Sequence, residues 1–149
     1  MKNALSFAVA ALLTVLAPSA VLNASAPGAP VAAGTVKITV HYTGKGKVDA
    51  SHKLWVWLFD TPNIGPGSMP IDQISLDKND VDATFEGLAD GKFYVAAAFD
   101  ETGSMMGDAP PPTGTPIGIL GMAAGAPAPV SPGAKDPAVL TFDDSLRMP

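Results

Sequence analysis

The sequence predicts an all-β protein built as a single antiparallel β-sandwich of about seven strands. Short runs of residues alternate between apolar and polar side chains, with the period of two that is typical of half-buried strands. Loops rich in glycine, proline and aspartate separate these runs. No run after the N-terminal segment shows the periodicity of a helix, so the strands have only each other to pack against.

The predicted strands differ in how their two faces are composed. Thr35–Tyr42 alternates cleanly between apolar and polar residues, whereas Leu54–Asp60 is apolar on both faces. A strand of the second kind is central in its sheet with both faces covered, or it uses one face for binding. The remaining predicted strands are Ile71–Leu76, Val81–Glu86, Lys92–Phe99, Ile117–Leu120 and Ala138–Phe142.

The segment Thr84–Gly103 gives the strongest local signal. Gly87–Gly91 supplies a turn with glycines where a positive φ costs little, and the residues after it alternate from Phe93 to Phe99. We therefore expect an antiparallel hairpin whose far end opens into an acidic loop. The loop 43–53 is likewise expected to close a hairpin.

The N-terminal segment has the layout of a secretory signal peptide. Lys2 supplies a positive start, Ala4–Leu16 is an uncharged and mostly apolar run, and small residues follow, with cleavage expected near 19–24. The run is shorter than the roughly 20 residues that span a membrane, although an uncleaved anchor is the alternative. We expect an exported protein, periplasmic or extracellular. The expected division is a signal peptide (1–24), a flexible Ala/Pro/Gly leader (25–34), a β-sandwich domain (35–145) and a tail (146–149).

Composition narrows the classes of function. The chain has no cysteine, which excludes disulfides, thiolate metal sites and a lipid anchor on cysteine. Its 9 basic and 14 acidic residues give a net charge of −5, and most lysines are scattered singly. Without a basic stripe we expect neither a nucleic-acid partner nor binding to anionic membranes, so cations or neutral molecules are favoured as partners.

Three stretches together resemble the carboxypeptidase regulatory-like, transthyretin-like (prealbumin-like) β-sandwich family: GTVKITVHYTG, FEGLADGKFYVAAAFDETG and AVLTFDDS. The resemblance spans about Gly34–Ser145 and implies an Ig-like, transthyretin-like sandwich. It also implies a mostly non-catalytic role as an accessory, adhesive or carrier module. One branch hydrolyses hydroxyisourate with histidines and a C-terminal Tyr-Arg-Gly-Ser. This chain ends in Ser-Leu-Arg-Met-Pro, so we expect no enzymatic activity.

Asp100, Glu101 and Asp108 are the candidate ligands of a metal, namely Ca²⁺, which binds six to eight oxygen atoms. Many members of the resembling family carry a fuller acidic loop here, whereas this chain has Met105 and Met106 at positions that are polar in those relatives. The alternative is a solvated acidic loop in which Asp100 caps a turn. We otherwise expect no cofactor.

Trp55, Trp57 and Phe59 lie on one face of one predicted strand. An aromatic row of this kind stacks on sugar rings or on an apolar patch of a partner. The favoured alternative is a packed core, with Leu54 and Val56 on the other buried face of the same strand, because soluble domains seldom expose such a patch.

The chain holds two histidines, His41 and His52, which with Met105, Met106 or Met122 would form a soft copper site. Their separation favours ordinary surface histidines instead. The sequence also lacks the motifs of serine hydrolases, zinc proteases and phosphate-binding loops, so no catalytic residue is assigned.

The sequence as a whole predicts a non-catalytic exported module that binds other envelope or extracellular proteins or associates with itself. The alternative is a carbohydrate- or small-ligand-binding envelope protein that uses the Trp55 and Trp57 face. A calcium-stabilised adhesion or assembly subunit is more remote. One route to self-association is the addition of the leader as a strand to a neighbouring subunit.

Overall fold

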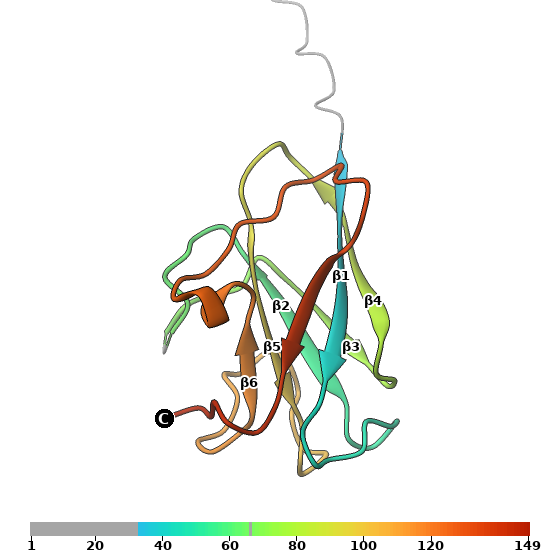
Figure 1. Ribbon diagram of the computed structural model, residues 1–149, viewed down its shortest axis with the longest axis vertical. Coiled ribbons are helices and arrows are strands. Elements are labelled where there is room, and N and C mark those ends of the chain that lie inside the picture. The colour runs from blue at the N-terminus through green and yellow to red at the C-terminus, as the bar shows by residue number, and fades with distance from the viewer. Residues whose placement is uncertain (1–32, 66) are drawn as a thin grey trace, which may run out of the picture.

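The computed structural model describes residues 33–65 and 67–149 as two β-sheets packed face to face (Figure 1). The three-stranded sheet has the order β4 (Val81–Leu88), β1 (Gly34–Tyr42), β7 (Ala138–Phe142). The four-stranded sheet has the order β3 (Asp72–Leu76), β2 (Leu54–Phe59), β5 (Tyr94–Phe99), β6 (Ile117–Ile119). Within this part of the chain the helical element is the short 3-10 helix η1 (Met122–Ala124). The predicted all-β sandwich of seven strands is confirmed.

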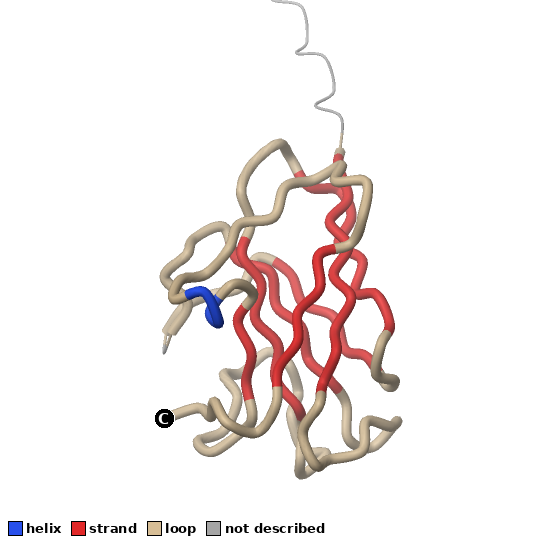
Figure 2. Tube along the Cα trace, viewed as in Figure 1, coloured by secondary structure: helices blue, strands red, loops and turns tan. Residues whose placement is uncertain are grey.

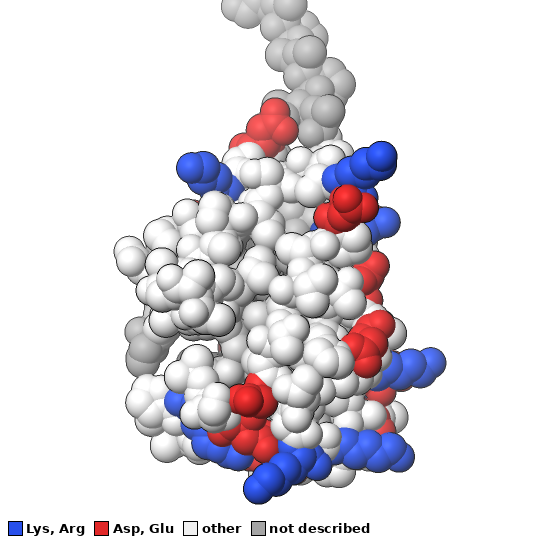
Figure 3. Space-filling view, in the orientation of Figure 1, with Lys and Arg blue, Asp and Glu red and all other residues white. Residues whose placement is uncertain are grey.

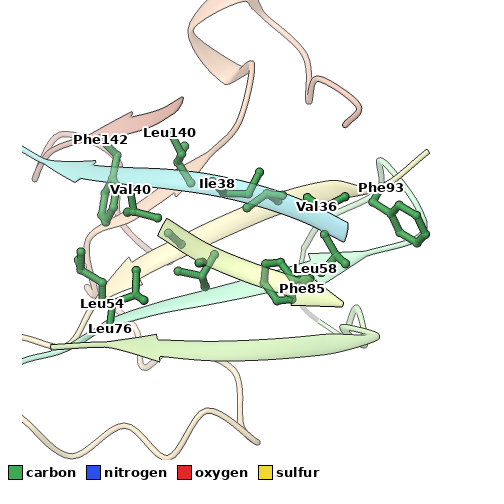
Figure 4. Packing of buried hydrophobic residues seen from close by; sticks show 14 of the residues in the cluster. Val36, Ile38, Val40, Leu54, Leu58, Leu76, Phe85, Phe93, Leu140 and Phe142 are labelled. Atoms are coloured by element: carbon green, nitrogen blue, oxygen red, sulfur yellow. The ribbon is translucent and has the colours of Figure 1, made fainter. Parts of the chain in front are cut away.

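The core fills the space between the two sheets (Figure 4). Alternate residues of each strand point into it, as the period of two predicts. Leu54, Val56 and Leu58 of β2 are completely buried there. Ile38 and Phe85 meet them from the opposite sheet and are also fully buried.

One strand pair departs from the antiparallel pattern. β1 and β7 run parallel, with Ile38 opposite Ala138 and Tyr42 opposite Phe142. The chain leaves β6 in the four-stranded sheet, and residues 120–137 carry it on to the end of the molecule where β1 begins, so that the Gly133 N–H donates to the carbonyl of Thr35 (3.0 Å). β7 therefore enters the three-stranded sheet in the direction of β1.

The hairpin predicted over Thr84–Gly103 is wrong. β4 pairs with β1 in one sheet, whereas β5 pairs with β2 and β6 in the other. The turn after Leu88 therefore crosses between the sheets, and the loop 43–53 does the same between β1 and β2. Alternating residues face the same core from either sheet, so the pattern alone does not distinguish a hairpin from a crossing.

The two hairpins that join neighbouring strands lie in the four-stranded sheet and have long connections. Residues 60–71 join β2 to β3, and residues 100–116 join β5 to β6. Since β2 and β5 are antiparallel, these loops leave the sheet at opposite ends. Figure 2 shows the long loops in tan beside the strands in red.

The C-terminal segment covers the outer edge of β6. Ile117 donates its N–H to the carbonyl of Leu146 (2.9 Å), and Met148 donates to the carbonyl of Thr115 (2.9 Å). A further bridge joins Pro116 to Arg147. The start of this edge therefore has its backbone groups paired, which protects that part from pairing with another chain.

The predicted signal peptide and leader lie almost wholly outside the described residues, as does the predicted addition of the leader to another subunit. Among residues 33–65 and 67–149, no helix has the length and apolar character needed to cross a membrane.

Candidate ligand-binding groove

The outer face of the four-stranded sheet is apolar, although it points away from the core. The register places two rows of side chains across it: Trp57, Ala96 and Ile119 in one row, and Trp55, Ala98 and Ile117 in the next. Each row has an alanine between an indole and an isoleucine. Because a methyl group fills little space, the face is hollow along β5.

The two long hairpin loops fold over this face from its two ends. Ile64 from residues 60–71 and Met105 from residues 100–116 both pack against a second apolar cluster centred on Trp57 and Phe59. This cluster is separate from the sandwich core. Burial against these loops leaves Trp57 only 5% exposed and Phe59 only 6% exposed.

Hydrogen bonds join Trp57 to the loop 100–116 and to β3. The Nε1–H of Trp57 donates to the carbonyl of Gly107 (3.1 Å) and to Oε1 of Gln73 (3.2 Å). Gly107 has a φ of 73°, which is the left-handed region that favours glycine. The backbone of Gly107 lies close to both indoles. The Nε1–H donor of Trp57 is already engaged by this backbone.

Between the loops lies a groove with a volume of about 630 Å³. Drug-sized ligands occupy pockets of about 300–1,000 Å³ that are mostly apolar. The floor and walls of the groove include Trp57, Phe59, Ile64, Ile71, Ile117 and Ile119. The groove therefore has the size and lining of a site for a small apolar molecule.

The structure brings the three predicted aromatic residues together on this outer face. Trp57 and Phe59 line the groove, whereas Trp55 lines a smaller and more polar cavity of about 320 Å³ beside His52 and Asp100. Nε1 of Trp55 is buried without a hydrogen-bond partner among the described residues. The row is therefore covered by loops and does not form the open, flat platform on which sugar rings stack.

Asp100 organises its own loop. The residue is only 3% exposed. Its carboxylate accepts hydrogen bonds from the backbone N–H groups of Thr102 and Ser104 (3.2 Å each) and of Met105 (2.9 Å). The Thr102 hydroxyl adds a fourth at 3.2 Å. These bonds are those of an aspartate that caps a turn.

The other two predicted calcium ligands lie apart from this arrangement. Glu101 forms an ion pair with Arg147 (2.9 Å), and Asp108 is exposed on the groove wall. Across the described residues, no group of three or more His, Cys, Asp or Glu side chains is placed to hold a metal ion. The calcium prediction gains no support from this placement.

Each histidine has an acidic neighbour. His41 contacts Asp80 on the three-stranded sheet, and Nδ1 of His52 lies 3.2 Å from Oδ1 of Asp49. Backbone N–H groups of His52 and Ser51 donate to Asp49, and these hydrogen bonds lower the pKa of its carboxyl. The two histidines thus belong to separate local contacts.

Comparison of the chain with protein-family models, with curated proteins and with solved structures found no match. The resemblance to the transthyretin-like family therefore stays a prediction, and the groove has to be interpreted from its own geometry.

Sequence reasoning found the aromatic row but missed the rest of the groove. The missed residues include Ala96, Ile117, Ile119, Ile64 and Met69. One signal for them was present, because Ala96 and Ala98 are apolar residues at the outward positions of Lys92–Phe99. Apolar residues on both faces of two strands indicate that something covers the outer face.

Proposed function

We propose that this protein is an exported, non-catalytic binding protein whose groove holds a small apolar ligand. The groove of about 630 Å³ over the outer face of the four-stranded sheet is the observation that carries the proposal. Pockets of this size and lining are the usual sites of small ligands. The signal-like N-terminus supports export.

Two of the polar groups around the groove hold its walls. The Trp57 N–H is bonded to Gly107 and Gln73, and the Ser68 hydroxyl donates to the carbonyl of Asn63 (2.8 Å). Groups held in this way set the shape of the site and do not act on a bound molecule. This supports the small-ligand alternative over a glycan platform, since the aromatic rings are covered.

Intrinsic fluorescence tests the proposal directly. Both tryptophans of the chain, Trp55 and Trp57, lie at this face, so a ligand in the groove changes the emission of the pure mature protein. The neutral dye phenylnaphthylamine is the probe. We expect saturable dye fluorescence together with energy transfer from tryptophan.

The matched variants are Ala96→Leu, which fills the hollow, and Ala89→Leu, which places the same side chain in an exposed turn. A ligand that loses about 60 Å² of apolar contact loses about 1.5 kcal/mol at about 25 cal/mol per Å², or about tenfold in affinity. We expect this loss of affinity for Ala96→Leu and not for Ala89→Leu.

Leucine at position 96 also crowds the neighbouring side chains. Ile119→Ala provides a second variant, because it widens the groove without crowding and weakens dye binding through lost contacts. Unchanged dye affinity in both folded variants, or no saturable binding to the unaltered protein, contradicts the proposal.

A further inference from the structure

The charged residues that line the groove all have the same sign. Asp72 and Asp108 are its ionisable lining side chains, and both are exposed at its rim. We propose that the ligand is a small apolar cation, in which an alkyl or aryl group is joined to one ammonium group. This inference rests on the proposed function and specifies the ligand of the same groove.

The interior of the groove suits the apolar part of such a molecule. Its lining offers isoleucines, methionines and prolines, and the indole donor is engaged with the wall. A peptide backbone buried there would leave its own N–H and C=O groups unpaired, at a cost of about 1–3 kcal/mol each. A compact ligand with a single polar group avoids that cost.

The rim of the groove suits the charged part of the ligand. A cation at the rim lies near the carboxylates of Asp72 and Asp108, whose attraction acts over about 8–10 Å at physiological ionic strength. An anionic amphiphile, such as a fatty acid, would meet repulsion from the same carboxylates.

The basic residue nearest in sequence to the groove lining does not offset the negative charge of the rim. Arg147 precedes Met148, which lines the groove, but its guanidinium is bonded to both carboxylate oxygens of Glu101 (2.9 and 3.3 Å) and to the carbonyl of Gly114 (2.6 Å). On the face that Figure 3 shows, charged side chains lie mainly at the two ends of the molecule and along the side of β4, while the surface over η1 is uncharged.

The experiment compares three amphiphiles of equal chain length by calorimetric titration of the mature protein at low salt. Octyltrimethylammonium, octanol and nonanoate each carry one octyl chain, joined to a positive, an uncharged or a negative group. We expect the affinity to fall in that order. Added salt is expected to reduce the preference for the cation, because the carboxylates are exposed.

The variants Asp72→Asn and Asp108→Asn assign the preference to the rim. Each is expected to weaken octyltrimethylammonium binding about two- to fivefold while octanol binding stays unchanged. Glu86→Gln is the matched control, since Glu86 is exposed on β4 in the other sheet. It is expected to change neither affinity.

The outcomes separate this inference from the function on which it rests. Equal binding of octanol and octyltrimethylammonium, or tighter binding of nonanoate, overturns the cationic ligand and leaves the apolar groove intact. A cation preference that survives both Asp variants also overturns the role of the rim. Failure of all three amphiphiles to bind counts against the groove itself.

Discussion

The backbone of Gly107 lies directly on the indole ring of Trp55. A Cβ atom added at Gly107 would stand 2.1 Å from Cζ3 and 2.6 Å from Cε3 of that ring. The carbonyl of the same glycine accepts the hydrogen bond from Trp57. One residue without a side chain therefore fixes the 100–116 loop to both tryptophans, and the groove wall depends on it.

Gly107→Ala is therefore expected to destabilise the protein and to move this wall. The added methyl group crowds the Trp55 ring and also strains a residue whose φ is 73°. Together these effects cost about 2–4 kcal/mol. Urea unfolding measures the loss, and tryptophan emission is expected to shift to longer wavelength as water reaches the indoles.

Gly133→Ala is the control for that experiment. Gly133 has a φ of 79° but no atom within 4 Å of the added Cβ, so it carries the backbone strain without the crowding. We expect a loss of about 1 kcal/mol and an unchanged emission spectrum. Equal losses for the two variants would show that the contact with Trp55 is unimportant.

Asp100→Ala tests the turn that begins the same loop. The buried carboxylate accepts three backbone hydrogen bonds and one from Thr102 Oγ1, and their removal is expected to cost about 1–3 kcal/mol. Asp90→Ala, in an exposed turn, is expected to cost much less. Melting curves with calcium and with a chelator complete the test. A higher melting temperature in calcium that Asp100→Ala abolishes would restore the metal hypothesis.

The pH dependence of stability is expected to reveal the contact between Tyr42 and Asp144. The Tyr42 hydroxyl donates to Asp144, and this bond, with a second from the Lys45 N–H, lowers the pKa of the Asp144 carboxyl below its ordinary 3.8. A carboxyl with a lowered folded-state pKa stabilises the protein above its unfolded pKa. That stability is lost as the pH falls through the folded-state pKa.

Tyr42→Phe isolates this contribution from those of the other carboxyls. We expect the difference in free energy of unfolding between the unaltered protein and Tyr42→Phe to be constant from pH 7 to about pH 5. It is then expected to shrink below about pH 4. Urea unfolding over this range measures it. A difference independent of pH down to the most acidic point would exclude Asp144 as the partner.

The sequence predicted the strands well and their connections poorly. The alternation in Thr35–Tyr42 located β1 to within one residue, because an apolar residue at every second position specifies a strand with one buried face. The same alternation in β4 and β5 did not show that they belong to different sheets, since both sheets share one core. The choice between a hairpin and a crossing depends on long-range packing.

The groove was predictable only in part for a related reason. Two apolar faces on Leu54–Asp60 indicated a central strand with covered or binding surfaces, and β2 is central in its sheet. The path of the loops 60–71 and 100–116 over that face was not readable, because their glycines and prolines permit many conformations. The hollow arises from that path and from the small side chain of Ala96.

Oxidation of methionine is expected to weaken ligand binding by this groove. Met69 and Met148 both line it, and Met69 is 81% exposed, so its sulfur is accessible to mild peroxide. The sulfoxide is polar, and an apolar ligand then loses contacts that the thioether supplied. We expect dye affinity to fall several-fold after oxidation and to recover after treatment with methionine sulfoxide reductase.

Leucine substitutions assign that effect to the groove. Met69→Leu keeps an apolar side chain of similar volume and is expected to preserve dye binding while removing most of the peroxide sensitivity. Met122→Leu is the matched control, because Met122 is 42% exposed in η1 and does not line the groove. Peroxide sensitivity that persists in Met69→Leu and disappears in Met122→Leu would place the ligand nearer η1 than the loop 60–71, and the boundary of the site would have to be redrawn there.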